Sequence, residues 1–114
     1  MGAPWVGFDL DGTLAEMNAW VDIYHIGPVI PRMLSIVKWF LNNGYTIKIF
    51  TARVSNGPEA IPPIRDWLEA NGLPRDLEIT NVKDFDCVEI WDDRVIAIES
   101  NTGNRLGGAS VLDL

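Results

Sequence analysis

The sequence predicts a single α/β domain built on a mainly parallel sheet. Short apolar runs alternate with segments of helical periodicity, and polar residues follow the apolar runs abruptly. The length of 114 residues supports one hydrophobic core and leaves no room for a second, so the domain is expected to span residues 1–114. Ligands of parallel sheets lie beyond the carboxyl ends of the strands, and the polar residues that end each run are therefore the site candidates.

The first half of the chain contains two expected strands, a long loop and a helix. Residues 4–9 form an apolar run that ends in acidic and glycine residues, as in a buried strand that leads into a loop. Residues 14–28 show no clear period and predict a long loop. Apolar residues recur at helical spacing over 30–41, and a glycine suited to the C-cap follows. Residues 45–51, β-branched and aromatic, predict the second strand.

The second half continues the alternation of helix and strand. Two prolines open a segment with one apolar face over 62–72, which predicts a helix because proline is tolerated in a first turn. Short strands are expected at 78–82, 86–91 and 95–98. The glycine-rich tail after residue 101 is weakly specified. The order of elements is that of a parallel sheet covered by helices on its faces.

Composition limits the partners and the compartment. The net charge of -7 repels phosphodiester backbones at long range and disfavours nucleic acid as a partner. Cys87 is the single cysteine, so an intramolecular disulfide is excluded, and no Cys/His set has zinc spacing. No 18 apolar residues follow one another. We expect a soluble, cytoplasmic protein from a reducing compartment, with no membrane partner.

The segment Asp9-Leu10-Asp11-Gly12-Thr13-Leu14 is the strongest chemical signal in the chain. It places two carboxylates at alternate positions directly after a buried strand, where they can divide the roles of nucleophile and acid/base. Gly12 permits a sharp turn, and Thr13 can tie that turn together. An isolated pair of this kind is more often a solvated acidic turn. A calcium loop is excluded because it requires glycine at Leu14 and glutamate at Trp20.

Residues 9–14 resemble the D-x-D-G-T-L signature of the haloacid dehalogenase superfamily, most of whose members are magnesium-dependent phosphatases. The second motif of that family, a threonine that closes an apolar strand, is matched by Thr51. The third, a lysine, is matched by Lys83, and the fourth, an acidic pair after a strand, by Asp92 and Asp93. The four motifs occur in order, and the resemblance implies a three-layer Rossmann-like domain.

The resemblance also implies roles for these residues. Asp9 would attack phosphorus and form an aspartyl phosphate, while Asp11 would protonate the leaving alcohol and later activate water. Thr51 and Lys83 would contact the transferred phosphoryl group. The cofactor would be Mg²⁺, and its expected ligands are Asp9, the Asp11 carbonyl, Asp92 and Asp93.

Further expected substrate contacts come from Gly12 and Thr13 in the turn and from Ala52 and Arg53 after the second strand. Arg53 contacts substrate in one interpretation and pairs with a surface acid in the other. Lys48 is a rival to Lys83, but it lies in the middle of a strand.

Three alternatives accompany this prediction. A signalling receiver domain uses similar residues, but no aspartate follows the 46–50 strand. A phosphate- or metal-binding domain without turnover would not need the full set of motifs. A dehalogenase that attacks carbon would need neither Asp11 nor a metal.

The substrate is less closely defined than the reaction. Neither 15–28 nor 54–75 is long enough to hold a cap domain, so the chain resembles a capless member. The loop at 15–28 is then expected to cover the site or to contact a second subunit in a homo-oligomer. We expect a phosphorylated small molecule or a nucleotide as substrate. Residues 9–17, 44–53 and 92–94 also resemble the phosphatase domain of phage polynucleotide kinase, which removes 3′ phosphates, but the acidic charge disfavours a nucleic acid end.

Overall fold

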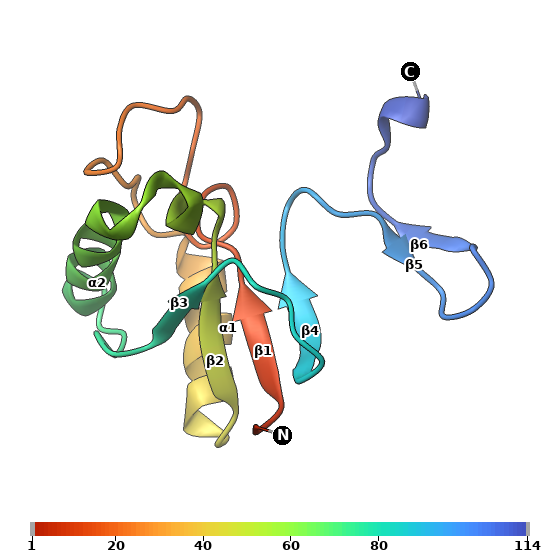
Figure 1. Cartoon of the computed structure of the whole chain (residues 1–114), viewed down its shortest axis with the longest axis horizontal. Coiled ribbons are helices and arrows are strands. Elements are labelled where there is room, and N and C mark those ends of the chain that lie inside the picture. The colour runs from red at the N-terminus through yellow and green to blue at the C-terminus, as the bar shows by residue number, and fades with distance from the viewer. Residues whose placement is uncertain (1, 114) are drawn as a thin grey trace.

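Four parallel strands organise the body of the chain in the computed structural model, which describes residues 2–113 (Figure 1). They are β1 (Trp5–Phe8), β2 (Thr46–Phe50), β3 (Glu78–Thr80) and β4 (Cys87–Trp91), in the order β3-β2-β1-β4. All three pairings are parallel. The predicted α/β architecture with a mainly parallel sheet is therefore confirmed, with strands one or two residues shorter than their sequence patterns.

Both α-helices pack on the same face of this sheet. Helix α1 (Pro31–Asn42) joins β1 to β2, and α2 (Ile61–Ala70) lies between β2 and β3. Alternate strand residues face the two helices and form the core with them. The principal members of this core are Val6, Phe8, Ile47, Ile49, Val37, Ile64 and Leu68. Each helix carries proline in its first turn, as expected from the sequence.

The expected three-layer arrangement is not confirmed for residues 2–113, whose two α-helices lie on one face of the sheet. The chain passes from β3 to β4 through residues 81–86, which are too few for a crossover helix. This extended segment crosses the face of the sheet opposite α1 (Figure 1). The Trp5 indole Nε1 donates to Asp84 Oδ1 at 2.8 Å, and the Lys48 ammonium lies 4.7 Å from the centre of the Trp5 ring. A connection of six residues thus covers the face where a helix was expected.

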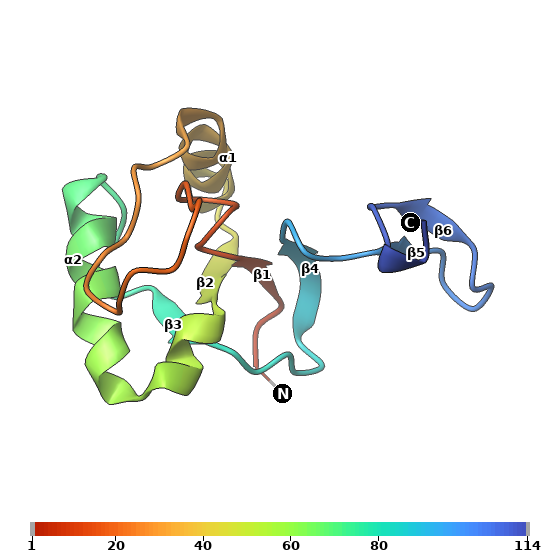
Figure 2. The same cartoon turned by 90° about the horizontal axis from the view of Figure 1, so that it is seen from above.

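The C-terminal residues form an arm that leaves the body. Strands β5 (Ala97–Ile98) and β6 (Arg105–Gly107) pair antiparallel and are followed by a short 3₁₀ turn, η3 (Val111–Asp113). Two views show this arm extending away from the sheet beyond β4 (Figures 1 and 2). The strand expected at 95–98 is present in shorter form, while β6 lies in the tail that the sequence specifies weakly. No helix within residues 2–113 combines the length and apolar character needed to cross a membrane.

Candidate functional site

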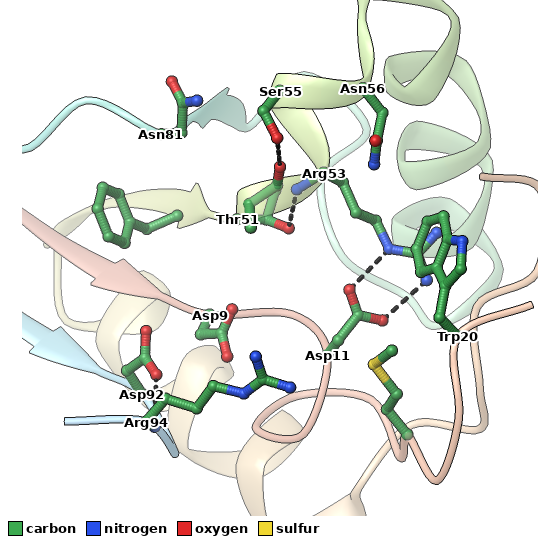
Figure 3. Close-up of a pocket in the computed structure, with 13 residues that line it drawn as sticks. Asp9, Asp11, Trp20, Thr51, Arg53, Ser55, Asn56, Asn81, Asp92 and Arg94 are labelled. Atoms are coloured by element: carbon green, nitrogen blue, oxygen red, sulfur yellow. Dashed lines mark hydrogen bonds and ion pairs between the residues drawn. The ribbon is translucent and has the colours of Figure 1, made fainter. Parts of the chain in front are cut away.

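A pocket of about 590 Å³ opens at the carboxyl ends of the parallel strands (Figure 3). It lies where ligands of parallel sheets are expected, at the edge where β1, β2 and β4 end. Six residues expected from the sequence line it: Asp9, Asp11, Thr51, Ala52, Arg53 and Asp92. Its remaining wall contains residues that the sequence analysis left without a site role, and these include Ser55, Asn56, Asn81 and Arg94.

Three carboxylates gather on one side of this pocket. Asp9, Asp92 and Asp93 each offer an oxygen, and these oxygens lie within 4.8 Å of one another. The register of the sheet brings them together, because the Asp9 amide donates to the Trp91 carbonyl at 2.9 Å where β1 and β4 end side by side. The Thr13 hydroxyl lies 3.3 Å from Asp9 Oδ2 and 3.4 Å from Asp93 Oδ1. A hydroxyl has one proton to donate, so Thr13 satisfies only one of these carboxylates at a time.

Gly12 makes the close approach of Asp93 possible. Its φ of 87° lies in the left-handed region, which favours glycine. A Cβ atom at this position would overlap the Asp93 carboxylate. The turn is closed by the Gly12 amide, which donates to the Ala15 carbonyl at 2.8 Å. The predicted turn at Gly12 is confirmed, and its second function is to leave room for an acidic side chain from the other end of the chain.

The crowding of carboxylates changes the acidity of Asp9. The pKa of Asp9 is raised from 3.8 to about 7, and burial is the largest cause. The hydrogen bond with Asp93 and the negative charge of Asp92 contribute to this rise, against a smaller lowering by the Leu10 amide. Each of the two raising neighbours favours the protonated form because like charges repel. In the metal-free protein Asp9 therefore keeps its proton to a much higher pH than an ordinary aspartate.

Arg53 holds Asp11 in a bidentate ion pair. Its Nε donates to Asp11 Oδ2 at 2.7 Å, and its Nη2 donates to Asp11 Oδ1 at 2.8 Å. The Arg53 side chain is only 4% exposed, so the pair is largely shielded from water. The sequence left Arg53 between substrate contact and acid pairing, and the geometry matches the second. The carboxylate of Asp11 is consequently turned toward Arg53 and is not part of the Asp9 cluster.

The same guanidinium fastens the 15–28 loop. Its Nη1 donates to the carbonyls of Asp22 and Ile23 at 3.5 and 3.3 Å, and its Nη2 donates to the His25 carbonyl at 2.9 Å. The Trp20 ring lies over the guanidinium at 4.8 Å, as a cation–π contact (Figure 3). One buried side chain therefore ties a site aspartate to the loop that was expected to cover the site.

Thr51 is placed by the short helix η1 (Ala52–Asn56) that follows β2. It is the N-cap residue of η1, and its hydroxyl oxygen accepts from the Arg53 amide at 3.1 Å. Its own amide donates to the Thr80 carbonyl at 2.9 Å. Thr51 is 2% exposed, so its position in the pocket wall is fixed by the backbone on both sides.

Within residues 2–113, none of the lysines lines the pocket. Lys48 pairs with Glu78 at 2.9 Å, away from the pocket as its place in the strand predicted. Lys83 lies in the exposed connection between β3 and β4 and does not line the pocket. Arg94 supplies a cation there instead, and Figure 3 shows it beside Asp9 and Asp92. The available sequence signal for Arg94 was its position directly after the acidic pair.

Comparison with family models, with curated proteins and with solved structures found no match for this chain. The functional interpretation therefore rests on the residues of the site and on their arrangement.

The Arg53 ion pair should be more important for stability than its charge alone implies. Arg53→Lys keeps the charge but loses the planar fork that contacts both Asp11 oxygens and the loop carbonyls. We expect a loss of about 3 kcal/mol in the free energy of unfolding, measured in urea. The control is Arg75→Lys, because Arg75 pairs with Asp66 while 46% exposed, and its effect on stability should be much smaller. Equal losses in the two variants would show that Arg53 does not hold the loop.

The raised pKa of Asp9 predicts that Asp9→Asn stabilises the metal-free protein by an amount that depends on pH. Below pH 3.8 the carboxyl is protonated in both states, and as the pH rises toward about 7 the unfolded chain loses its proton while the folded site resists ionisation. The ionisable Asp9 therefore destabilises the folded state more and more as the pH rises over this range. Asparagine has no proton to lose and removes this effect. The melting temperature of Asp9→Asn relative to wild type should rise between these limits with a chelator present.

Asp76→Asn is the control for this titration, because Asp76 is exposed and does not line the pocket. Its difference from wild type should change little over the same pH range. A parallel change in both variants would contradict the assignment of the effect to Asp9.

Proposed function

We propose that this chain is a magnesium-dependent phosphomonoester hydrolase of the haloacid dehalogenase type, with Asp9 as its nucleophile. The observation that carries the proposal is the gathering of Asp9, Asp92 and Asp93 within 4.8 Å at the ends of β1 and β4. Thr51, at the end of β2, lines the same pocket. The helices of the body lie on one face of its sheet, which differs from the three-layer fold that the resemblance implies. The proposal therefore rests on the site and on the order of the motifs in the sequence.

The donor set of this cluster fits a hard divalent cation. Asp9, Asp92 and Asp93 offer only oxygen ligands, which Mg²⁺ prefers. Burial and, to a smaller extent, the neighbouring Asp93 and Asp92 raise the pKa of Asp9, and a cation would favour its ionised form. When bound, Mg²⁺ supplies positive charge that neutralises the phosphoryl oxygens.

Asp9 is the group placed to form the covalent intermediate. One of its carboxylate oxygens attacks phosphorus, the bond from phosphorus to the alcohol oxygen breaks, and the departing alcohol takes a proton. A water molecule then attacks the phosphoryl group on Asp9 and releases inorganic phosphate. The Thr13 hydroxyl, 3.3 Å from Asp9 Oδ2, restricts the orientation of the attacking carboxylate.

Asp11 is the proposed proton donor and acceptor: its protonated carboxyl gives the proton to the leaving alcohol, and the carboxylate so formed takes a proton from the attacking water. Arg53 occupies one direction at each Asp11 oxygen, and each oxygen retains a second lone pair for the leaving alcohol or for water. The rigid fork keeps the Asp11 carboxylate at the pocket wall, so its role is to transfer a proton at a fixed position.

The first test is the dependence of hydrolysis on Mg²⁺ and on Asp9. Hydrolysis of an aryl phosphate should require Mg²⁺ and should be lost in Asp9→Asn, because the amide cannot act as the nucleophile. Asp76→Asn, a charge change on the exposed surface, should retain wild-type turnover. Full activity of Asp9→Asn, or equal rates with Mg²⁺ and with chelator, would exclude the proposed reaction.

The second test decides which cation contacts the phosphoryl group. Lys83 remains the prediction of the sequence motif, whereas Arg94 lines the pocket together with Arg53, whose guanidinium is paired with Asp11. Removing one preorganised charge should lower kcat on the order of 10²-fold. From the geometry we expect this loss in Arg94→Ala, with a small effect in Lys83→Ala. The reverse result would require residues 81–86 to move toward Asp9 when substrate binds.

A further inference from the structure

The pocket has more room and more apolar wall than a phosphate group requires. Its volume of about 590 Å³ is within the usual range for small-molecule sites, roughly 300–1,000 Å³. Met17, Trp20 and Phe50 add apolar surface to the lining, next to the carboxylates. The part of the substrate that leaves with the alcohol oxygen therefore has an apolar place to bind.

Trp20 is an exposed aromatic side chain held in a fixed position. The residue is 49% exposed, and it lines three adjoining pockets at this edge of the sheet. The Arg53 guanidinium lies against the ring at 4.8 Å and also holds the loop on both sides of Ile23. An indole restrained in this way loses little conformational entropy when a second flat group stacks on it.

The pocket lining also offers polar side chains that can recognise the edge of such a group. Asn56 in η1 and Asn81 after β3 are exposed in the pocket lining. Figure 3 shows both amides without an interaction to the other residues drawn. An asparagine amide offers one acceptor and two donors in one plane, which matches the edge of a nucleobase.

We propose that Trp20 is a stacking platform for the base of a nucleoside monophosphate, with Asn56 on the same side of the pocket to recognise the base edge (Figure 3). This inference rests on the proposed function, because it places the phosphate at Asp9. The acidic chain favours a free nucleotide over a nucleic acid end, since the net charge of -7 repels a polyanion more strongly than a single phosphate ester. The alcohol released is then a nucleoside.

A binding experiment without phosphate tests the platform apart from catalysis. Adenosine should bind the wild-type protein in the presence of chelator, as measured by saturation-transfer NMR and calorimetry. Trp20→Leu should weaken this binding about 10-fold, because base–aromatic stacking is lost. Trp20→Phe should restore most of it. Absence of adenosine binding by wild type, or equal affinity in Trp20→Leu, would overturn the inference.

Tyr24→Leu is the matched control for this experiment. Tyr24 belongs to the same loop and is 72% exposed, but it lines none of the three pockets. Its replacement should leave adenosine affinity unchanged. An equal loss in Tyr24→Leu would assign the effect to the loop as a whole and would contradict a platform at Trp20.

Kinetics with two esters separates this inference from the proposed function. With Mg²⁺, Trp20→Leu should raise KM for adenosine monophosphate about 10-fold and should raise KM for glycerol phosphate much less, so that the preference for the nucleotide falls. Adenosine binding without hydrolysis of any ester would contradict the phosphatase proposal and leave the platform standing. Hydrolysis of both esters with equal kcat/KM would contradict the platform alone. A higher kcat/KM for a 3′-phosphorylated oligonucleotide than for adenosine monophosphate would overturn the assignment to a free nucleotide.

Discussion

The buried ion pair between Arg53 and Asp11 is the interaction on which the arrangement of the site depends. It connects three parts of the chain that are separate in sequence: the turn after β1, the 15–28 loop and the helix η1 after β2. A buried guanidinium is costly to desolvate unless each of its donors finds an acceptor. Here two carboxylate oxygens and three loop carbonyls accept from it. The loop carbonyls therefore satisfy the donors of the buried guanidinium, and the guanidinium in turn holds the loop in place.

The sequence predicted the strands of the sheet and the residues at their ends because both follow from local patterns. Apolar runs that stop at Asp9, Thr51 and Asp92 indicate strand ends, and parallel strands necessarily bring those ends to one edge. The role of Arg53 could not be decided locally. Its partners lie 28 to 42 residues away, and an arginine two residues after a strand has no local feature that distinguishes an ion pair from a ligand contact.

Sequence patterns could not predict the missing third layer or the position of Arg94, for a different reason. The sequence predicted strands at 78–82 and 86–91 with a short loop between them, but sequence alone does not show whether that loop replaces a helix on the uncovered face. In the structure, the Trp5 indole donates to Asp84 and the Trp5 amide donates to the Asp86 carbonyl, and these bonds hold the segment against the sheet. Arg94 enters the pocket because the chain bends directly after Asp92, whose carboxylate accepts from the Arg94 amide at 2.7 Å. A bend of this kind depends on one side chain and leaves no periodic trace.

The pairing of β1 with β4 closes the longest loop in the sheet, since Trp5 lies beside Cys87. Closing a loop of this length costs chain entropy before any contact repays it, so contacts of such high order form late in folding. The carboxylates of Asp9 and of the Asp92–Asp93 pair stand at the two ends of that loop, where their repulsion opposes closure. A divalent cation shared between them would act as a cross-link between the first and last strands of the sheet. Folding of the body and loading of the site would then be one linked equilibrium.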